Sequence, residues 1–345
     1  MIKTIHSLLP GKALAALLAA AAILLASTEF MQDWGLSALT LAILGGIALG
    51  NSVFNQPASR FDAGVLFSKG PLLRLGIILY GFRITFQEIA GVGMAGVLID
   101  ALVLCSTFFI AYQLGTRLLK LDRDTSILIG AGSSICGAAA ILATEPVVKA
   151  RADKVAVAVS TVVIFGTIAM FLYPLLFRLN EVMPWLASER YFGIFTGATI
   201  HEVAQVVAAG REMGEAAGAA AVITKMIRVM MLAPFLVALS FWLGRNKSGQ
   251  GEARSKISMP WFALLFVGVA GFNSLNLLPA AIVQAILALD TFLLAMAMAA
   301  LGLHTRIEAI RQAGTRPILL AGLLFAWLLG GGSVISFGVQ KLFGA

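Results

Sequence analysis

The chain of 345 residues is 59% hydrophobic and only 12% charged, with a mean hydropathy of +0.93. Because a soluble domain usually carries about 25% charged residues, this composition excludes an ordinary cytosolic enzyme and a disordered chain. The formal net charge of +8 does not indicate nucleic-acid binding, since most cations stand between hydrophobic stretches. Two cysteines in apolar segments are too few for a disulfide scaffold. The pattern predicts an all-α polytopic membrane protein.

A helix that crosses the bilayer needs about 20 mostly apolar residues, and eleven segments come near this length. Lys3 and Lys12 precede the first segment, but Glu29 and Asp33 follow it where a secretory signal would have small residues. We therefore interpret the first segment as a retained helix. The eleven segments are 12–28, 36–50, 57–83, 94–116, 126–148, 155–177, 191–210, 216–243, 260–275, 279–303 and 317–342.

Two of these segments are rich in glycine and hydroxyl residues. Residues 130–141 read GAGSSICGAAAI, and residues 197–210 read GATIHEVAQVVAAG. Such clusters weaken a helix, and non-helical backbone at membrane depth survives only against protein or a water-filled cavity. Segments 126–148 and 191–210 are therefore predicted to be interrupted helices or re-entrant hairpins. Residues 200–206 weakly echo residues 135–141, which suggests a related pair; the alternative is two unrelated helix breaks.

Lysine and arginine near the ends of the segments predict the orientation. Lys3 and Lys12 place the N-terminus in the cytoplasm, and cations also gather in the stretches 117–123 and 149–154. Both stretches are cytoplasmic if segment 126–148 dips into the membrane and returns. This gives nine full crossings, two re-entrant segments that enter from opposite sides, and a C-terminus outside the cell. Eleven full crossings would also place the C-terminus outside.

The chain contains an internal repeat. NSVFNQP at 51–57 recurs as NSLNLLP at 273–279, GFRITFQEI at 81–89 resembles GLHTRIEAI at 302–310, and Gly93 corresponds to Gly314. The repeat units are about 36–116 and 260–342, and the predicted topology gives them opposite orientations in the membrane. They flank a central core of about 126–243, and together they form one transporter domain, 1–345. Inverted repeats with interrupted helices are the architecture of secondary transporters.

Charges in the predicted spans are the main candidates for function, because a charge at the bilayer centre costs about 2.5–3.5 kcal/mol. Lys225 and Arg228 lie near the middle of segment 216–243 and share one helix face. They require counter-charges, either a bound anion or acids such as Glu202, Asp290 and Glu145. A purely structural ion-pair network is the alternative.

His201, Glu202 and Gln205 stand within about one turn of each other. A zinc protease motif would need histidine at position 205, so a metal site is not expected. A histidine or a desolvated carboxylate can carry a coupling proton near neutral pH. The alternative is that His201 and Glu202 cap a broken helix and pair with Lys225 or Arg228.

The predicted site combines these side chains with donors of the glycine-rich segments, since free amides at the start of a half-helix suit an anion. Cys136 is also readily explained as a packing residue, and the asparagines as turn residues. The substrate-binding candidates are Ser133, Ser134, Gly132, Cys136, Gly137, His201, Gln205, Lys225 and Arg228; the ion-coupling candidates are His201, Glu202 and Asp290; the secondary candidates are Asn51, Asn273, Ser274 and Arg74.

The motifs at 130–141, 145–147 (EPV) and 200–210, followed by KMIR at 225–228 and Pro234, resemble the YeiH-type bacterial inner-membrane proteins, which are grouped as a sulfate exporter family. The resemblance runs in order over most of the chain. It implies membership of the sodium/proton antiporter superfamily, with an inverted-repeat fold, unwound core helices and elevator-type movement. It makes sulfate or an organosulfonate the expected substrate.

The sequence therefore predicts a secondary active transporter of a small anion in the bacterial inner membrane, coupled to H⁺ or Na⁺. No cofactor is expected, since the glycine-rich run lacks the Gly-Lys-Ser/Thr ending of a nucleotide loop. The expected partners are the anion, the coupling ion and the lipid bilayer, with no nucleic acid, and a homodimer is left open. The alternatives are an anion channel and a membrane sensor or enzyme without transport, although no nucleophile and base stand together as an enzyme requires.

Overall fold

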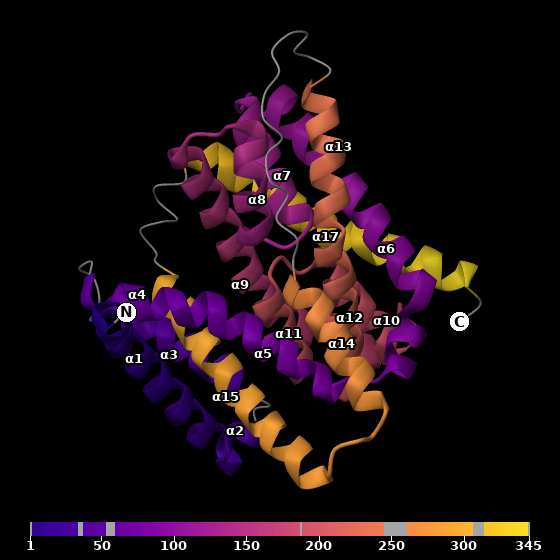
Figure 1. Cartoon of the computed structure of the whole chain (residues 1–345). Helices are drawn as coiled ribbons and strands as arrows, with labels where there is room; N and C mark the ends of the chain where they lie inside the picture. The colour runs from indigo at the N-terminus through magenta and orange to yellow at the C-terminus, as the bar shows by residue number, and fades with distance from the viewer. Residues whose placement is uncertain are drawn as a thin grey trace. The chain divides into compact units, whose positions relative to one another are not determined.

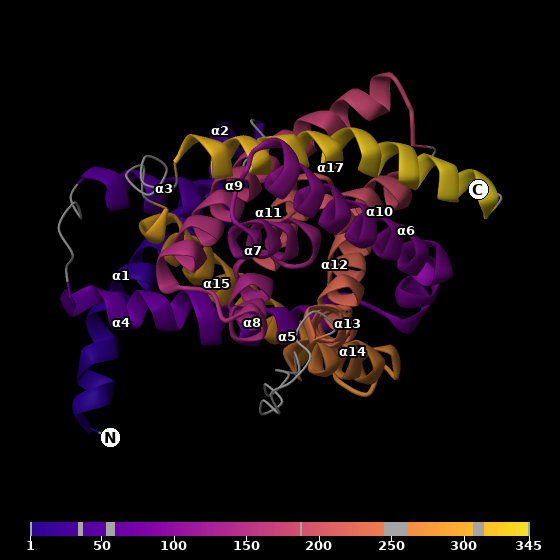
Figure 2. The same ribbon diagram turned by 90° about the horizontal axis from the view of Figure 1, so that it is seen from above.

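The computed structural model describes residues 2–33, 37–52, 59–186, 188–244, 261–305 and 314–343, and it contains helices and no strands over those ranges (Figures 1 and 2). Among the described residues, seven helices are long and apolar enough to cross a membrane. The prediction of an all-α polytopic membrane protein is confirmed. The seven are Ser7–Ala26, Arg60–Arg83, Phe86–Leu118, Asp153–Val182, Glu215–Leu243, Ala280–His304 and Thr315–Leu342.

The predicted spans 36–50 and 260–275 correspond to shorter apolar helices. They form α3 (Ala38–Ser52) and α14 (Trp261–Ser274), of 15 and 14 residues. At 1.5 Å per residue these helices are about 21–23 Å long, which is less than the roughly 30 Å of a hydrocarbon core. The described parts of these two spans are therefore too short to cross as straight helices.

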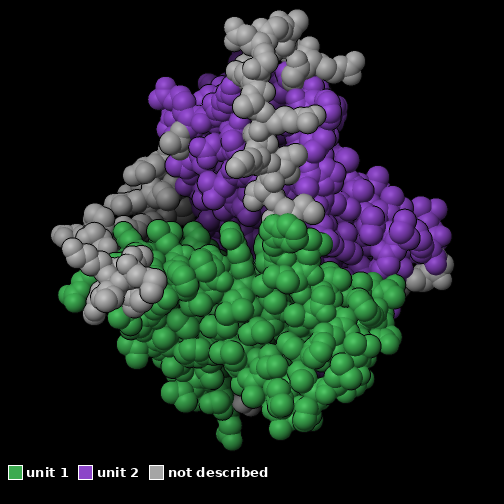
Figure 3. Space-filling view, in the orientation of Figure 1, with its two compact units in different colours: residues 1–90, 261–307 green, residues 91–260, 308–345 purple. Residues whose placement is uncertain are grey.

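The helices form two compact units, which Figure 3 colours separately. Unit 1 comprises residues 1–90 and 261–307, and unit 2 comprises residues 91–260 and 308–345. Within unit 1, α3 packs closely on α15, because a Cβ on Gly46 would meet the backbone of Ala299. Besides α3 and α14, unit 1 holds α1 (Ile2–Ala26), α2 (Glu29–Asp33), α4 (Ser59–Phe67), the π-helical turn η1 (Ser68–Leu72), α5 (Leu73–Tyr80), the 3₁₀ turn η2 (Gly81–Arg83), the first residues of α6 and α15 (Ala280–His304).

Unit 2 contains both glycine-rich segments. In Figure 1 the pair α7 and α8 lies toward one end of this unit and the group α10 to α12 toward the other. Aliphatic side chains of α7, α8, α9 and α17 form a shared core that includes Leu128, Ile141, Val162 and Leu324. The elements of unit 2 are α6 (Phe86–Gln113), η3 (Leu114–Leu118), α7 (Arg123–Ser134), α8 (Ala138–Val148), α9 (Ala152–Val182), α10 (Glu189–Thr199), α11 (Val203–Glu212), α12 (Glu215–Met230), α13 (Leu232–Gly244) and α17 (Thr315–Leu342).

Candidate functional site: two broken helices around buried cations

Both glycine-rich segments are interrupted helices, as predicted. The first breaks between α7 and α8, where Gly137 has a φ of +68°, a conformation that favours glycine. The second breaks between α10 and α11, where Ile200 and Glu202 are extended. Each half-helix of 10–12 residues is about 15–18 Å long, or roughly half of a hydrocarbon core.

In the first segment the chain reverses direction at its break. A Cβ on Gly132 of α7 would meet Ile141 of α8, so the two half-helices lie against each other on either side of Gly137. They therefore form a hairpin, and α8 also packs on α13. Segment 126–148 is a helical hairpin in this structure.

The second segment also turns back. Gly193 and Gly197 of α10 approach the backbone of Ala217 and Ala221 of α12, in the same order along both helices, so α10 and α12 run parallel. Helix α11 lies between them in sequence and is joined to α12 by two residues, 213 and 214, so it runs the opposite way. Segment 191–210 is thus a second hairpin.

Lys225 of α12 joins the tips of the two hairpins. Its side chain is fully buried, and its Nζ donates hydrogen bonds to the carbonyl oxygens of Ile135, at 2.8 Å, and Ile200, at 2.6 Å. These residues are the C-caps of α7 and α10. One ammonium therefore stabilises the partial negative charge at the C-terminal ends of two half-helices.

Arg228, one turn after Lys225, binds the end of the first hairpin only. Its Nε donates to the carbonyl oxygen of Ser134 at 2.6 Å, and Nη2 donates to that of Ser133 at 3.3 Å. The guanidinium is fully buried, and its Nη1 has no hydrogen-bond partner among the described residues. Within the described ranges, the hydrogen-bond partners of the two cations are thus main-chain carbonyl oxygens, where the sequence led us to expect an anion or acids.

Glu202 performs the complementary task at the N-terminal ends. Its Oε1 accepts a hydrogen bond of 3.4 Å from the amide of Ala138, the first residue of α8. It also forms a capping box on α11, in which Gln205 Oε1 accepts from the Glu202 amide at 3.0 Å. Within the described ranges, no ion pair joins Glu202 to Lys225 or Arg228. The predicted capping role of Glu202 is therefore present, and the pairing is not.

Several buried polar atoms around the hairpin tips have no partner in the described part of the chain. Buried polar atoms are normally hydrogen-bonded, so such a group marks a place for water or a polar ligand. Asp100 of α6 was not singled out from the sequence, although it is the only acid in the predicted span 94–116. The unpartnered groups are both ring nitrogens of His201, both carboxylate oxygens of Asp100, Ser133 Oγ, Gln205 Nε2, Thr224 Oγ1 and Arg228 Nη1.

The structure thus brings the principal sequence candidates together, from Gly132 to Gly137, from His201 to Gln205, and at the two α12 cations. Cys136 is buried at the first break, and the ring of His201 lies 6.4 Å from that of Phe325. The remaining candidates belong to unit 1.

Asp290, an ion-coupling candidate, is fully buried in unit 1 and pairs with Arg83, whose Nε donates to Oδ2 at 2.9 Å. Arg83 also donates to the carbonyl of Leu287 and the hydroxyl of Thr291, so this pair fastens η2 to α15. Arg74 is exposed. These contacts give Asp290 a structural role within its unit.

The asparagines of the sequence repeat make reciprocal contacts. Asn51 donates to the carbonyl oxygen of Thr305 at 2.8 Å, and Asn273 donates to that of Ile84 at 3.3 Å. In the repeat, Asn273 corresponds to Asn51 and Thr305 corresponds to Ile84. The two halves of the repeat therefore make the same contact with each other. Ser274 Oγ accepts from the amide of Phe86 at 2.8 Å.

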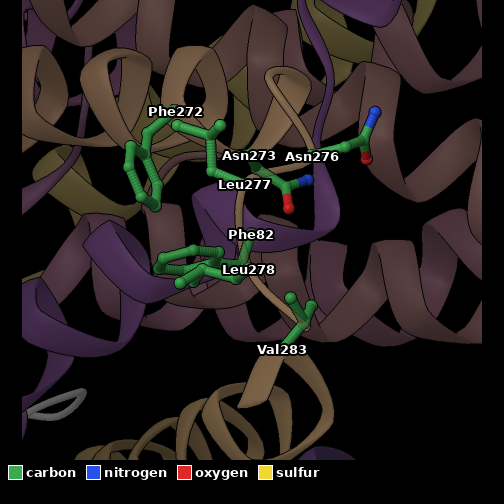
Figure 4. A pocket seen from close by; sticks show the side chains of 7 residues that line it. All are labelled: Phe82, Phe272, Asn273, Asn276, Leu277, Leu278 and Val283. Carbon is green, nitrogen blue, oxygen red and sulfur yellow. The ribbon is translucent and has the colours of Figure 1, made fainter. Parts of the chain in front are cut away.

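A pocket in unit 1 lies beside Asn273 (Figure 4). It has no charged residue in its lining, so it offers little to attract an anion. The lining residues are Phe82, Phe272, Asn273, Asn276, Leu277, Leu278 and Val283.

Comparison with known proteins agrees with the resemblance seen in the motifs. The model of a family described as conserved hypothetical protein 698 matches residues 10–321. The UPF0324 membrane protein plu2856 of Photorhabdus laumondii is 58% identical over 98% of this chain and 95% of its own length. The UPF0324 membrane protein PA5383 of Pseudomonas aeruginosa is 59% identical over 96% and 94%.

The UPF0324 inner membrane protein YeiH of Escherichia coli K12 is 54% identical over 99% of this chain and 97% of its own length. These matches, with the apolar helices described above, support a multi-pass protein of the inner membrane. The chain belongs to the UPF0324 family of membrane proteins, which includes YeiH.

Proposed function

We propose that this protein is a secondary active transporter of a small anion, sulfate or an organosulfonate, driven by a proton or sodium gradient through alternating access. The observation that carries the proposal is the Lys225 ammonium, which is shared between the ends of two opposed broken helices. Broken helices that meet inside the membrane are the usual substrate and ion sites of secondary transporters.

The choice of an anion rests on the unpartnered donors. Arg228 Nη1, the Ser133 hydroxyl and the His201 ring can all donate hydrogen bonds, and none has a partner in the described ranges. A guanidinium is well suited to oxyanions, because its planar donors match the spacing of their oxygens. These groups favour sulfate or sulfonate over a neutral or cationic substrate.

The proposal includes a non-enzymatic protein with its N-terminus in the cytoplasm and its C-terminus outside. The cations of the stretches 117–123 and 149–154 support this orientation through the positive-inside rule.

The proposal is tested by reconstitution in proteoliposomes. We expect uptake of labelled sulfate or methanesulfonate that responds to an imposed pH or sodium gradient. Arg228→Ala should abolish uptake, because it removes the buried cation next to the break. Arg178→Ala, which removes an exposed arginine of α9, is the matched control and should transport normally.

Equal transport by Arg228→Ala and the wild type, at equal protein level, would contradict the anion site. Conductance that does not couple to any gradient would identify a channel instead. An absence of flux for both anions would favour a sensor or an enzyme.

A further inference from the structure

Asp100 is the buried acid that the capping contacts of the hairpins leave unused. It lies on α6, its side chain is fully buried, and neither carboxylate oxygen has a hydrogen-bond partner among the described residues. An ionised carboxylate in such a place is destabilised by several kcal/mol unless a cation or a proton compensates it. Its surroundings therefore decide its charge.

Two cations of α12, Arg228 and Lys225, lie close enough to Asp100 to attract its carboxylate electrostatically. Gly96, one turn before Asp100, faces Thr224, one turn before Arg228: a Cβ on Gly96 would lie 3.8 Å from Thr224 Oγ1. The α6 face that carries Asp100 is thus turned toward the α12 face that carries Arg228. No ion pair between them is found within the described ranges, so they attract each other without direct contact.

The capping contacts divide the charges near the breaks into two sets. Lys225 serves the C-terminal ends of α7 and α10, and Glu202 serves the N-terminal ends of α8 and α11. At about half a charge per helix end, each of these two side chains is compensated by main-chain dipoles. Arg228 and Asp100 remain, each with an unused hydrogen-bonding atom.

An anion bound to Arg228 Nη1 would change the proton affinity of Asp100. It adds a negative charge nearby and offsets the field of the guanidinium, and both effects favour the neutral carboxylic acid. By reciprocity, a proton on Asp100 strengthens anion binding by the same factor. Sodium is a poorer occupant, because Arg228 and Lys225 repel a second cation.

Building on the transport function proposed above, we propose that Asp100 takes up one proton from water when the anion binds Arg228, so that anion and proton cross the membrane together. The carboxylate becomes a carboxylic acid on loading and returns its proton to water when the anion leaves. This role differs from the sequence prediction, which gave the proton to His201 or Glu202. Glu202 needs its charge to cap α8 and α11.

The test measures proton uptake on binding of sulfate to the purified wild-type protein. Titration calorimetry in two buffers of different ionisation enthalpy gives the number of protons taken up per anion. We expect a value approaching about one where Asp100 is ionised before binding, and affinity that rises up to about tenfold per unit fall in pH. Asp100→Asn should bind sulfate with no uptake and little pH dependence, and Asp100→Glu should restore uptake.

Asp290→Asn is the matched control, because it also removes a fully buried helical carboxylate, one that pairs with Arg83. Its proton uptake should equal that of the wild type. Proton uptake that persists in Asp100→Asn, or wild-type binding without uptake, would overturn the role of Asp100 and leave the transport proposal standing. If the wild type neither binds nor transports sulfate or methanesulfonate, the transport proposal itself fails.

Should Asp100→Asn not fold, infrared difference spectra of the wild type decide. A carboxylic acid band must appear when sulfate is added, and its absence would refute the proposal.

Discussion

Lys225 shows how a buried ammonium can be stable without a carboxylate beside it. Two main-chain carbonyl oxygens, of Ile135 and Ile200, accept hydrogen bonds from its Nζ at 2.8 and 2.6 Å. Each carbonyl ends a half-helix and so carries the accumulated partial charge of that helix. The lysine therefore holds the fold together, in addition to its place in the proposed site.

Replacement of Lys225 by methionine should destabilise the protein by about 2–4 kcal/mol, because two buried carbonyls would lose charged hydrogen bonds. The measurement is the midpoint of unfolding in detergent. Lys341→Met, which changes an exposed lysine of α17, is the control and should unfold like the wild type. Equal stability of Lys225→Met and the wild type would contradict the role of the lysine as a structural link.

At this scale the sequence predicted which side chains gather and could not predict what they bind. Lys225 and Arg228 stand out because charges are costly in an apolar segment. Their partners are carbonyl oxygens, which every residue possesses and which therefore leave no trace in the sequence. Asp100 did carry the same signal as the two cations, an isolated charge in an apolar span, and could have been found by it.

The glycines of the first hairpin serve two different purposes, which the sequence did not distinguish. The sequence predicted a break in each segment, and the first one falls at residues 135–137, after the Gly130–Ser134 run. Gly137 is needed there for its positive φ, whereas Gly132 lets Ile141 and Val162 approach α7. Glycine frequency alone cannot separate these two uses, because one depends on the backbone and the other on packing.

Asp122 begins α7 and makes the first hairpin sensitive to acid. Its carboxylate accepts from the Thr125 amide at 3.1 Å and from Lys154 Nζ at 2.6 Å. Partial burial raises the pKa of Asp122, but the hydrogen bonds from Lys154 and Thr125 outweigh this and hold it below its usual value. The stabilisation is therefore present above the pKa of the unfolded chain and is lost as the pH falls through the lower native pKa.

Asp122→Ala should destabilise the protein by about 1 kcal/mol at pH 7, because α7 loses its N-cap. The difference from the wild type should begin to shrink below about pH 4, the usual pKa of an unfolded aspartate, and should vanish once the pH has fallen through the lower native pKa of Asp122. Thermal unfolding in detergent from pH 7 to pH 3 checks this. Asp122→Asn keeps a capping oxygen without the charge and should be less affected than Asp122→Ala; a loss independent of pH would rule out the ionised cap.

For the whole molecule, the division into units cuts through both halves of the sequence repeat. Helices α3 to α5 and α14 to α15 lie in unit 1, whereas most of α6 and all of α17 lie in unit 2. The motif spacing predicted which segments correspond. It could not predict how they group, because grouping depends on contacts between segments far apart in the chain, such as those of Asn51 and Asn273, which span 254 and 189 residues.

The chain passes from one unit to the other near residues 90 and 307, and each of these points is followed within seven residues by a glycine with positive φ. Gly93 has a φ of +47° and Gly314 a φ of +81°, and the two positions correspond in the repeat. Among the described residues, an added Cβ would meet nothing at Gly93 and only Pro317 Cδ, 3.9 Å away from it, at Gly314. Alanine at these positions would therefore act through the backbone alone.

Gly93→Ala and Gly314→Ala should each destabilise the protein by about 1–2 kcal/mol, and in the transport cycle proposed above they should also slow transport as stiffened hinges. Transport rates in proteoliposomes and unfolding midpoints measure the two effects. Gly338→Ala near the C-terminal end of α17, where an added Cβ also meets no described atom, is the control and should do neither. Wild-type rates in both variants would exclude these glycines as hinges.

One lysine and one glutamate cap four half-helix ends, and their opposite charges also bear on the response of the protein to the membrane potential. What matters for that response is the net charge of the groups at the hairpin tips. The charges of Lys225 and Glu202 cancel, and those of Arg228 and an ionised Asp100 cancel too, so in the transport cycle proposed above the empty protein has no net charge at its hairpin tips. Its return across the membrane would be indifferent to the membrane potential. With one proton on Asp100, a sulfonate would also cross without net charge. Sulfate would carry one net negative charge outward, and a potential of 100 mV, negative inside, would favour its export by about 2.3 kcal/mol.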